Sequence, residues 1–212
     1  YRHTGYEAKN DRGWIINLKF VMIEGQPDRE VLNISRMYQK SVPYGDVTKF
    51  RDNTPEFTWT PTKGTKTSRI KIIQTGHGMD QPSNCAEFCP RNRFLYLDGN
   101  CFDTSLVWRA DCGENPVYPQ AGTWIYDRSG WCPGQNVLEY NVDLTENGSD
   151  HTFDLDMEAY TKTSGNSNYV ITAYLVEYGD IKKGQDASII DIIQPSTHSQ
   201  HLRRNPICSE PT

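Results

Sequence analysis

Phe153-Asp154-Leu155-Asp156-Met157-Glu158-Ala159 is the stretch that decides the fold. Its apolar residues occupy every second position, and acidic residues occupy the positions between them. Successive side chains of an extended strand point to opposite faces, so this alternation predicts a strand with one buried and one solvated face. Half-buried strands of this kind are typical of antiparallel sheets. A second alternating stretch near the start of the chain predicts another such strand. Its apolar members are Trp14, Ile16, Leu18, Phe20 and Met22.

Further segments rich in Val, Ile, Tyr, Phe and Thr are expected to be strands, and no long amphipathic helix is visible. Turn residues separate several of them, as at Asp98-Gly99-Asn100 and Glu146-Asn147-Gly148. About eight to ten strands in one chain predict an all-β fold, an antiparallel two-sheet sandwich or jelly roll. The segments are 30–40, 55–60, 68–75, 93–98, 103–109, 136–143, 168–178 and 188–193.

The chain is expected to hold one domain and a tail. Residues 1–193 would form the jelly roll, and the polar residues 194–212 would form an irregular C-terminal tail. The stretch 76–134 is rich in cysteine and proline, which predicts long loops inserted between strands. Loops carried by a rigid sandwich are where binding chemistry usually lies, so the functional site is sought there.

Composition excludes several classes of partner. The formal net charge of the 212-residue chain is −5, and no block of lysine or arginine appears, which argues against a nucleic-acid partner. No apolar run approaches the roughly 20 residues of a membrane span, so no membrane partner is expected. The chain begins at Tyr1 and shows no secretory signal, so we expect a mature protein or a fragment.

The cysteines point to disulfide bonds. There are six of them, and none belongs to the paired C-x-x-C array of a structural zinc site. The five histidines are scattered along the chain, which also disfavours a metal site. We therefore expect no metal, and we expect an oxidising compartment, which means the periplasm, the cell surface or the secreted space.

Cys85-Ala86-Glu87-Phe88-Cys89 places an acidic residue between two cysteines only four positions apart. In a disulfide-rich chain such cysteines would close a small ring and hold the Glu87 carboxylate on a stiffened loop. A carboxylate that is already in place needs no reorganisation when a reaction begins. It could accept hydrogen bonds from a sugar hydroxyl or orient an attacking water. The alternative is that Glu87 is a solvated loop residue.

Other side chains in this region have two possible roles each. His77 stands between two glycines at the end of a predicted strand, and could be a catalytic base or a structural histidine that donates to a backbone carbonyl. Arg128 could stack on tryptophan and bond to Asp127 or Asp111, or it could offer its donors to a sugar oxygen or an amide carbonyl. Loop tryptophans can stack on a sugar or fill the core, and we expect one of three to touch ligand. They are Trp108, Trp124 and Trp131.

A set of short motifs in the loop region forms one specific combination. The motifs are Gly76-His77, Cys85-Ala86-Glu87-Phe88-Cys89, Cys112, Asn115-Pro116, Gln120, Gly122-Thr123-Trp124 and Asp127-Arg128-Ser129-Gly130-Trp131-Cys132-Pro133-Gly134. Read together, they resemble the second domain of the bacterial peptide:N-glycosidase F family. The resemblance runs from residue 14 to 190 and is strongest over 73–134.

This resemblance implies a double jelly roll with the active site in the cleft between its two domains. The reaction would be hydrolysis of the bond between an asparagine side-chain amide and the first N-acetylglucosamine, without metal or cofactor. The substrate would be an N-glycosylated peptide or protein, and the products would be aspartate and a glycosylamine. Glu87 falls on the family's active-site glutamate and Arg128 on its substrate-binding arginine. We take Trp124 and His77 as further candidate substrate contacts.

The resemblance also implies the disulfide pairing. It pairs Cys85 with Cys89 and Cys112 with Cys132. The two remaining cysteines are then left for a third bridge, which would be Cys101–Cys208.

Three departures from the family pattern affect the expected site. The family's principal catalytic aspartate lies on a first domain that nothing in this chain supplies, so we expect a companion jelly-roll domain as partner. Thr75 stands where the family has a tryptophan before Gly-His, which would remove one aromatic sugar contact. The glutamate of the interdomain segment should fall among residues 1–13, where Glu7 is the one candidate for substrate binding.

The alternative function is a non-catalytic jelly-roll module that grips glycans without cutting them, which the absence of a first domain favours. A double jelly roll of the copper monooxygenase kind would need a His-x-His motif and a histidine–methionine set. We do not find these in the sequence.

Overall fold

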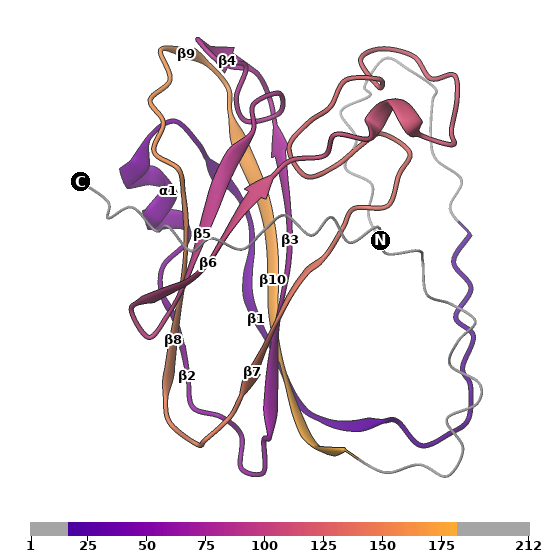
Figure 1. The fold of residues 1–212 in the computed structure, drawn as a ribbon, viewed down its shortest axis with the longest axis vertical. Helices are drawn as coiled ribbons and strands as arrows, with labels where there is room; N and C mark the ends of the chain where they lie inside the picture. Colours follow the sequence, from indigo (N-terminus) through magenta and orange to yellow (C-terminus); the bar gives the residue numbers. More distant parts are fainter. Residues whose placement is uncertain (1–16, 182–212) are drawn as a thin grey trace.

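Two four-stranded antiparallel sheets form the body of the molecule, and a small two-stranded sheet lies at one end (Figure 1). The computed structural model describes residues 17–181. The first sheet has the strand order β1-β10-β3-β7 and the second the order β2-β8-β5-β6, while β4 pairs with β9. The predicted all-β sandwich of the jelly-roll kind is confirmed. Its elements are β1 Arg29–Pro43, α1 Val47–Asn53, β2 Phe57–Trp59, β3 Thr67–His77, β4 Asp80–Gln81, β5 Arg91–Leu97, β6 Asn100–Val107, the 3-10 helix η1 Cys112–Glu114, β7 Tyr140–Thr145, β8 His151–Met157, β9 Ser164–Gly165 and β10 Asn168–Ile181.

The core lies between the two large sheets and follows the alternation of the sequence. Phe153 and Leu155 of β8 have no exposed surface, and Met157 is nearly as well buried. Burial of each such side chain contributes roughly 1.5–3 kcal/mol. The facing strand β10 contributes four side chains with no exposed surface, because its apolar residues also occupy alternate positions. They are Tyr169, Ile171, Ala173 and Leu175.

The alternation of β8 breaks at its carboxyl end. Asp156 was expected to face solvent, but it is 9% exposed because Arg51 of α1 covers it with an ion pair of 2.6 Å. The strand ends at Met157, so Ala159 is exposed and does not extend the buried face. The short helix α1 was not foreseen, although Asp46 caps it in the usual way by accepting a hydrogen bond from Lys49 N.

The prediction of a strand in the early alternating stretch, residues 14–22, is wrong for the part that the structure describes. Residues 17–24 contain no strand, and Leu18, Phe20 and Met22 are 74%, 79% and 90% exposed. Alternation produces a strand only when another strand can pair with it and a core can receive its apolar face. Among residues 17–181 nothing pairs with this stretch, and β1 forms the edge of its sheet.

Most other predicted strands are present with shifted ends. The strand predicted at 103–109 is β6, which ends at Val107, and the one predicted at 136–143 is β7, which begins at Tyr140. The segment 188–193, the tail 194–212, Glu7 and Cys208 lie outside the described residues. No helix within 17–181 is both long and apolar enough to cross a lipid bilayer.

Candidate active site

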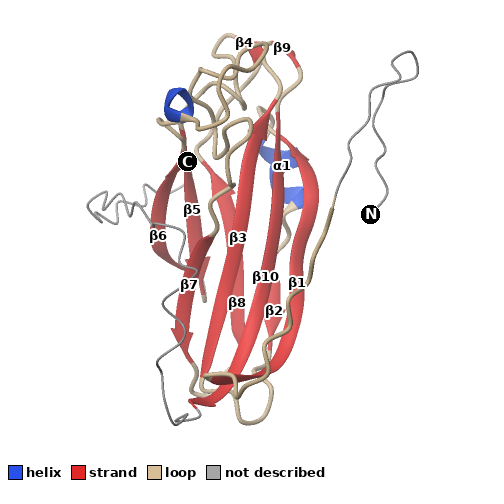
Figure 2. Ribbon diagram, turned by 90° about the vertical axis from the view of Figure 1, so that its right-hand side faces the viewer, coloured by secondary structure: helices blue, strands red, loops and turns tan. Residues whose placement is uncertain are grey.

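Loops gather at the end of the sandwich that carries β4 and β9 (Figure 2). Strand β3 runs into this end and finishes at His77. Loop residues on either side of β5 and β6 supply Glu87 and Arg128, which come together although they are 41 positions apart. Both residues belong to the segment 76–134, and the location of the site in this segment stays a prediction.

Glu87 is held by backbone contacts on both sides. Its N–H donates to the carbonyl of Gly78 at 3.1 Å, and its own carbonyl accepts from Ser129 N at 2.9 Å. Its carboxylate Oε2 accepts from Gly78 N at 3.2 Å. The side chain keeps 18% of its surface exposed, so it is oriented by the protein and still reachable from solvent. It is not the solvated loop residue of the alternative reading.

Arg128 holds the other carboxylate oxygen of Glu87. Its Nη1 donates to Oε1 at 2.8 Å, and its guanidinium carbon lies 4.9 Å and 4.8 Å from the ring centres of Phe88 and Trp131. Two charged groups at this distance form a charge-assisted hydrogen bond. Burial lowers the pKa of Arg128, and the Glu87 carboxylate opposes this effect.

Arg128 is almost fully buried and donates to backbone carbonyls as well. The residue is 2% exposed, Nε donates to the carbonyl of Tyr126 at 3.2 Å, and Nη2 donates to the carbonyl of Thr123. Its stacking on Trp131 was one of the two sequence interpretations, but its carboxylate partner is Glu87 and not Asp127 or Asp111. Contact between Arg128 and a substrate stays a prediction.

Two disulfides frame these residues as the family resemblance implied. Cys85–Cys89 and Cys112–Cys132 are both formed, with Cα–Cα distances of 5.0 Å and 5.1 Å. Cys101 is also disulfide-bonded, and its expected partner Cys208 lies outside the described residues.

Two glycines allow the loops to approach β3 closely. A Cβ on Gly76 would lie 2.6 Å from the Ser129 Cβ and would overlap the carbonyl oxygen of Ala86. Gly130 has a φ of +78°, and a Cβ there would overlap the carbonyl oxygen of Gln74. These positions therefore have no room for a larger residue, which explains the glycine in both sequence motifs.

His77 lies beside the Glu87–Arg128 pair at the end of β3. Its Nε2 is 2.8 Å from the hydroxyl of Thr75, and its ring centre is 5.1 Å from that of Trp131. Burial lowers the pKa of His77, while Glu87 raises it and Arg128 lowers it further. The His77 ring thus contacts a side-chain hydroxyl and not the backbone carbonyl that the structural interpretation expected.

The tryptophans differ in their distance from the pair. Trp131 stacks on Arg128, and its Nε1 donates to the carbonyl of Gly76 at 2.9 Å. Trp124, chosen as a substrate contact, is 8% exposed and packs edge-on against Tyr118 at 5.5 Å. Sequence reasoning had not singled out Phe88 or Ser129, although both stand inside the quoted motifs next to Glu87 and Arg128.

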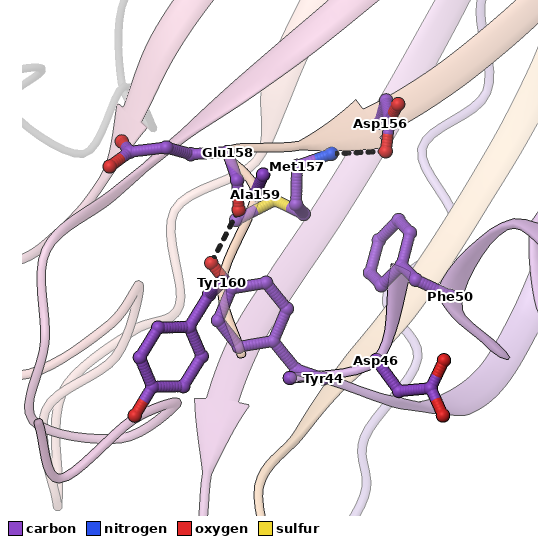
Figure 3. A pocket seen from close by; sticks show the side chains of 9 residues that line it. Tyr44, Asp46, Phe50, Asp156, Met157, Glu158, Ala159 and Tyr160 are labelled. Atoms are coloured by element: carbon purple, nitrogen blue, oxygen red, sulfur yellow. Dashed lines mark hydrogen bonds between the residues drawn. The ribbon is translucent and has the colours of Figure 1, made fainter. Parts of the chain in front are cut away.

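The hollow in Figure 3 lies elsewhere and is too small for a substrate. It is lined by Tyr44, whose hydroxyl donates to the carbonyl of Glu158 at 2.7 Å, and by the residues around Met157. Its free volume of about 10 Å³ has room for about one water molecule. Within residues 17–181, no three His, Cys, Asp or Glu side chains come together in a way that could hold a metal ion.

Fold and site together define a jelly-roll domain with a fixed, partly exposed carboxylate among disulfide-bonded loops. Over residues 44–176 the sequence matches the family described as "Peptide-N-glycosidase F, C terminal". The chain therefore belongs to the peptide-N-glycosidase F family, and it corresponds to the C-terminal domain of that family.

Known relatives agree with this assignment. Over 183 residues the chain is 26% identical to peptide-N(4)-(N-acetyl-β-D-glucosaminyl)asparagine amidase F of Elizabethkingia miricola, covering 78% of this chain and 50% of that protein. It therefore spans about half the length of this curated relative. The structure of PNGase F from Flavobacterium meningosepticum superposes with a TM-score of 0.66 at 24% identity, over 74% of this chain and 55% of that one. Another crystal structure of an asparagine amidase of this name gives 0.67 at 23% identity, over 76% and 56% of the two chains. These two structural matches show the shared fold.

Proposed function

We propose that this chain supplies one half of the active site of a glycoamidase, an enzyme that removes N-linked glycans by hydrolysing the asparagine side-chain amide. The observation that carries the proposal is the Glu87 carboxylate, held by Arg128 and Gly78 in a member of this family. The name of the curated relative, an asparagine amidase, supports the reaction class.

In the proposed reaction, water adds to the carbonyl carbon of the glycosylated asparagine and the carbon–nitrogen bond breaks. The water loses a proton and the leaving nitrogen gains one, so the sugar departs as a glycosylamine and an aspartate stays in the peptide. Glu87 accepts a hydrogen bond from the attacking water or from a hydroxyl of the first sugar. Because both of its oxygens already have protein donors, the carboxylate is oriented before substrate arrives.

Arg128 acts first on Glu87, whose carboxylate it orients through the 2.8 Å hydrogen bond from Nη1. Its second Nη1 hydrogen is the donor we assign to a substrate oxygen, in keeping with the resemblance. His77 and Trp131 lie next to the pair, and we assign them to the wall of the sugar site. Trp124 and Glu7 remain predicted substrate contacts.

A second acid–base group is needed for the reaction. An amide resists attack by water, and a protonated group must help the nitrogen leave while a carboxylate activates the water. The chain covers 50% of the curated relative, which leaves room in such a protein for another domain. We therefore propose a companion jelly-roll domain that carries the missing aspartate, with an N-glycosylated peptide or protein bound between the two domains.

The disulfides support an oxidising compartment for this reaction. Cys85–Cys89 and Cys112–Cys132 would not persist in a reducing cytosol. We propose that the protein works in the periplasm, at the cell surface or outside the cell, where glycoproteins can reach it.

A glycan-binding module without catalysis is the second candidate. The observation that favours it is a pair of exposed rings, Tyr118 and Tyr126, which are 74% and 60% exposed on the loop that Cys112–Cys132 closes. Exposed rings with a polar tip are suited to sugars, which present both apolar faces and hydroxyls.

Mass spectrometry of a glycopeptide separates the two functions. The glycopeptide is incubated with the 212-residue chain alone and with the full-length gene product. An amidase converts the glycosylated asparagine to aspartate and releases the whole glycan, and we expect this from the full-length product. If the full-length product binds the glycopeptide and leaves its mass unchanged, the binding module is correct and the amidase proposal is wrong.

A further inference from the structure

Asp80 is a buried carboxylate directly beneath the loop that carries Glu87. It is 2% exposed and lies in β4, where it pairs with Gly165 of β9. The two strands are packed so tightly that a Cβ on Gly165 would lie 2.7 Å from the Asp80 Cα. The small sheet therefore fixes the Asp80 backbone before the loop begins.

Asp80 holds the first residues of this loop through both its backbone and its side chain. Its carbonyl accepts a hydrogen bond from Asn84 N at 3.2 Å. Its Oδ1 accepts from Cys85 N at 3.0 Å, and the same oxygen accepts from the Tyr160 hydroxyl at 2.7 Å. One oxygen thus accepts two hydrogen bonds, one from the backbone of the loop and one from a side chain that follows β8.

The second carboxylate oxygen of Asp80 lowers the stability of the fold. Oδ2 is buried and has no hydrogen-bond partner among the described residues. A buried polar oxygen without a donor destabilises the fold, so stability alone does not explain a carboxyl group at this position. What Asp80 offers is its other oxygen, Oδ1, which accepts two hydrogen bonds.

We propose that Asp80 is a positioning residue for Glu87. The Cys85 N–H bond to Oδ1 fixes one end of the Cys85–Cys89 ring, and the Ser129 N–H bond to the carbonyl of Glu87 fixes its middle. Together they set where the Glu87 backbone stands, and Arg128 then sets where its carboxylate points. The catalytic consequence rests on the proposed amidase function, whereas the structural consequence does not.

Three variants test the proposal. Asp80→Ala removes the acceptor for Cys85 N, and we expect kcat for glycan release by the full-length product to fall roughly 10- to 100-fold with little change in KM, the loss typical of a misplaced catalytic group. Asp80→Asn keeps an oxygen at the Oδ1 position without the charge, and should retain kcat within a few-fold and leave the pH profile unchanged. Tyr160→Phe removes the other donor to Oδ1 and serves as the matched control with near wild-type kcat.

Nuclear magnetic resonance of the 212-residue chain gives a readout that needs no activity. Amide exchange of Cys85 should accelerate, and the carboxyl carbon of Glu87 should shift, in Asp80→Ala but in neither of the other two variants. Unchanged Cys85 and Glu87 signals in Asp80→Ala would overturn the proposal. So would a folded Asp80→Asn that loses kcat as Asp80→Ala should, because then the charge and not the hydrogen bond matters. This second result decides the question if Asp80→Ala does not fold. A wild-type protein that releases no glycan would refute the amidase function and leave the resonance test standing.

Discussion

The sandwich and its loop end are held together by different means. In the sandwich, alternate apolar side chains of the facing sheets share one core and have no exposed surface, as is the case for Leu155 and Ile171. At the loop end, the most buried groups include Ser129 and Arg128, which are fixed by hydrogen bonds, and cysteines that are fixed by disulfides. Apolar packing supplies stability without demanding one arrangement of polar groups, whereas the hydrogen bonds place a charged group at a defined point. Stability should therefore depend mainly on the first region, and activity on the second.

The largest loss of stability is expected from the sandwich. Leu155→Ala removes a side chain with no exposed surface and leaves a cavity, which should lower the free energy of unfolding by about 2–5 kcal/mol. Urea unfolding measures it. Leu106→Ala is the matched control, because Leu106 is 43% exposed and its loss should change stability by no more than about 0.5 kcal/mol. Equal effects of the two variants would contradict the assignment of the core.

The next prediction compares the two disulfides of the loop end, which should differ in their effects on stability and on glycan release. Replacing Cys112 and Cys132 by serine opens a ring of 20 positions, which should cost about 3 kcal/mol through the greater entropy of the unfolded chain. Opening Cys85–Cys89, which are only 4 positions apart, should lower the free energy of unfolding by about 2 kcal/mol on the same reasoning. It should nevertheless reduce the rate of glycan release more than the first double variant does, because it frees Glu87. Unfolding and release are measured on both double variants. The comparison fails if the larger ring proves to be the one that governs activity.

Gly76→Ala should disturb the contact between the loops and β3. The added Cβ would lie 2.6 Å from the Ser129 Cβ, and overpacking of this kind costs about 1–3 kcal/mol. Because Ser129 N donates to the carbonyl of Glu87, release should fall as well. Gly113→Ala is the control, since its Cβ would make an ordinary contact of 3.6 Å with Ile125. Similar activity in both variants would show that the close approach at Gly76 does not position Glu87.

The smallest expected effect is a difference in how the stability contributions of two histidines depend on pH. His151, at the other end of the sandwich, lies with Nδ1 2.9 Å from Asp98 and Nε2 3.1 Å from Glu146. Burial opposes its charge, but the two carboxylates outweigh burial and raise its pKa. The stability that it contributes is therefore full below its ordinary pKa of 6.5 and is lost as the pH rises through the higher folded value. His77 has a lowered pKa, so its contribution is full above 6.5 and is lost as the pH falls through the folded value.

Urea midpoints of His151→Gln and His77→Gln across pH 5 to 9 check these signs. The gap between wild type and His151→Gln should be largest at the acidic end, by up to about 1 kcal/mol. The difference in stability between wild type and His77→Gln should become smaller as the pH falls. Slopes of the same sign for both variants would contradict the account.

The sequence predicted the fold best where the alternation of a strand matches the faces that the fold buries and exposes. The alternation of 153–157 predicts β8 correctly, because β5 and β2 pair with it and β10 faces it. The same alternation fails at Leu18, Phe20 and Met22, because periodicity reports a face but cannot supply the strand that pairs with it.

At the site, the residue types were easier to foresee than their partners. The motif around Glu87 pointed to a fixed carboxylate, and the family resemblance supplied the pairing of its cysteines. The contact from Arg128 to Glu87 joins positions 41 apart, and the bond from Tyr160 to Asp80 joins positions 80 apart. Such pairs are set by the order of strands in the sheets, which a local pattern does not encode. Asp80 and Ser129 were missed for this reason.

The rate of glycan release by Glu87→Gln in the full-length product tests the central claim most directly. Glutamine keeps the shape and one acceptor for Arg128 but loses the charge, so the fold should survive while release falls by about 10²- to 10⁴-fold, the usual effect of losing an acid–base group. Glu114→Gln, which changes an exposed carboxylate on the neighbouring loop, should release glycans at the wild-type rate. Wild-type release by Glu87→Gln would show that the held carboxylate is not part of the reaction.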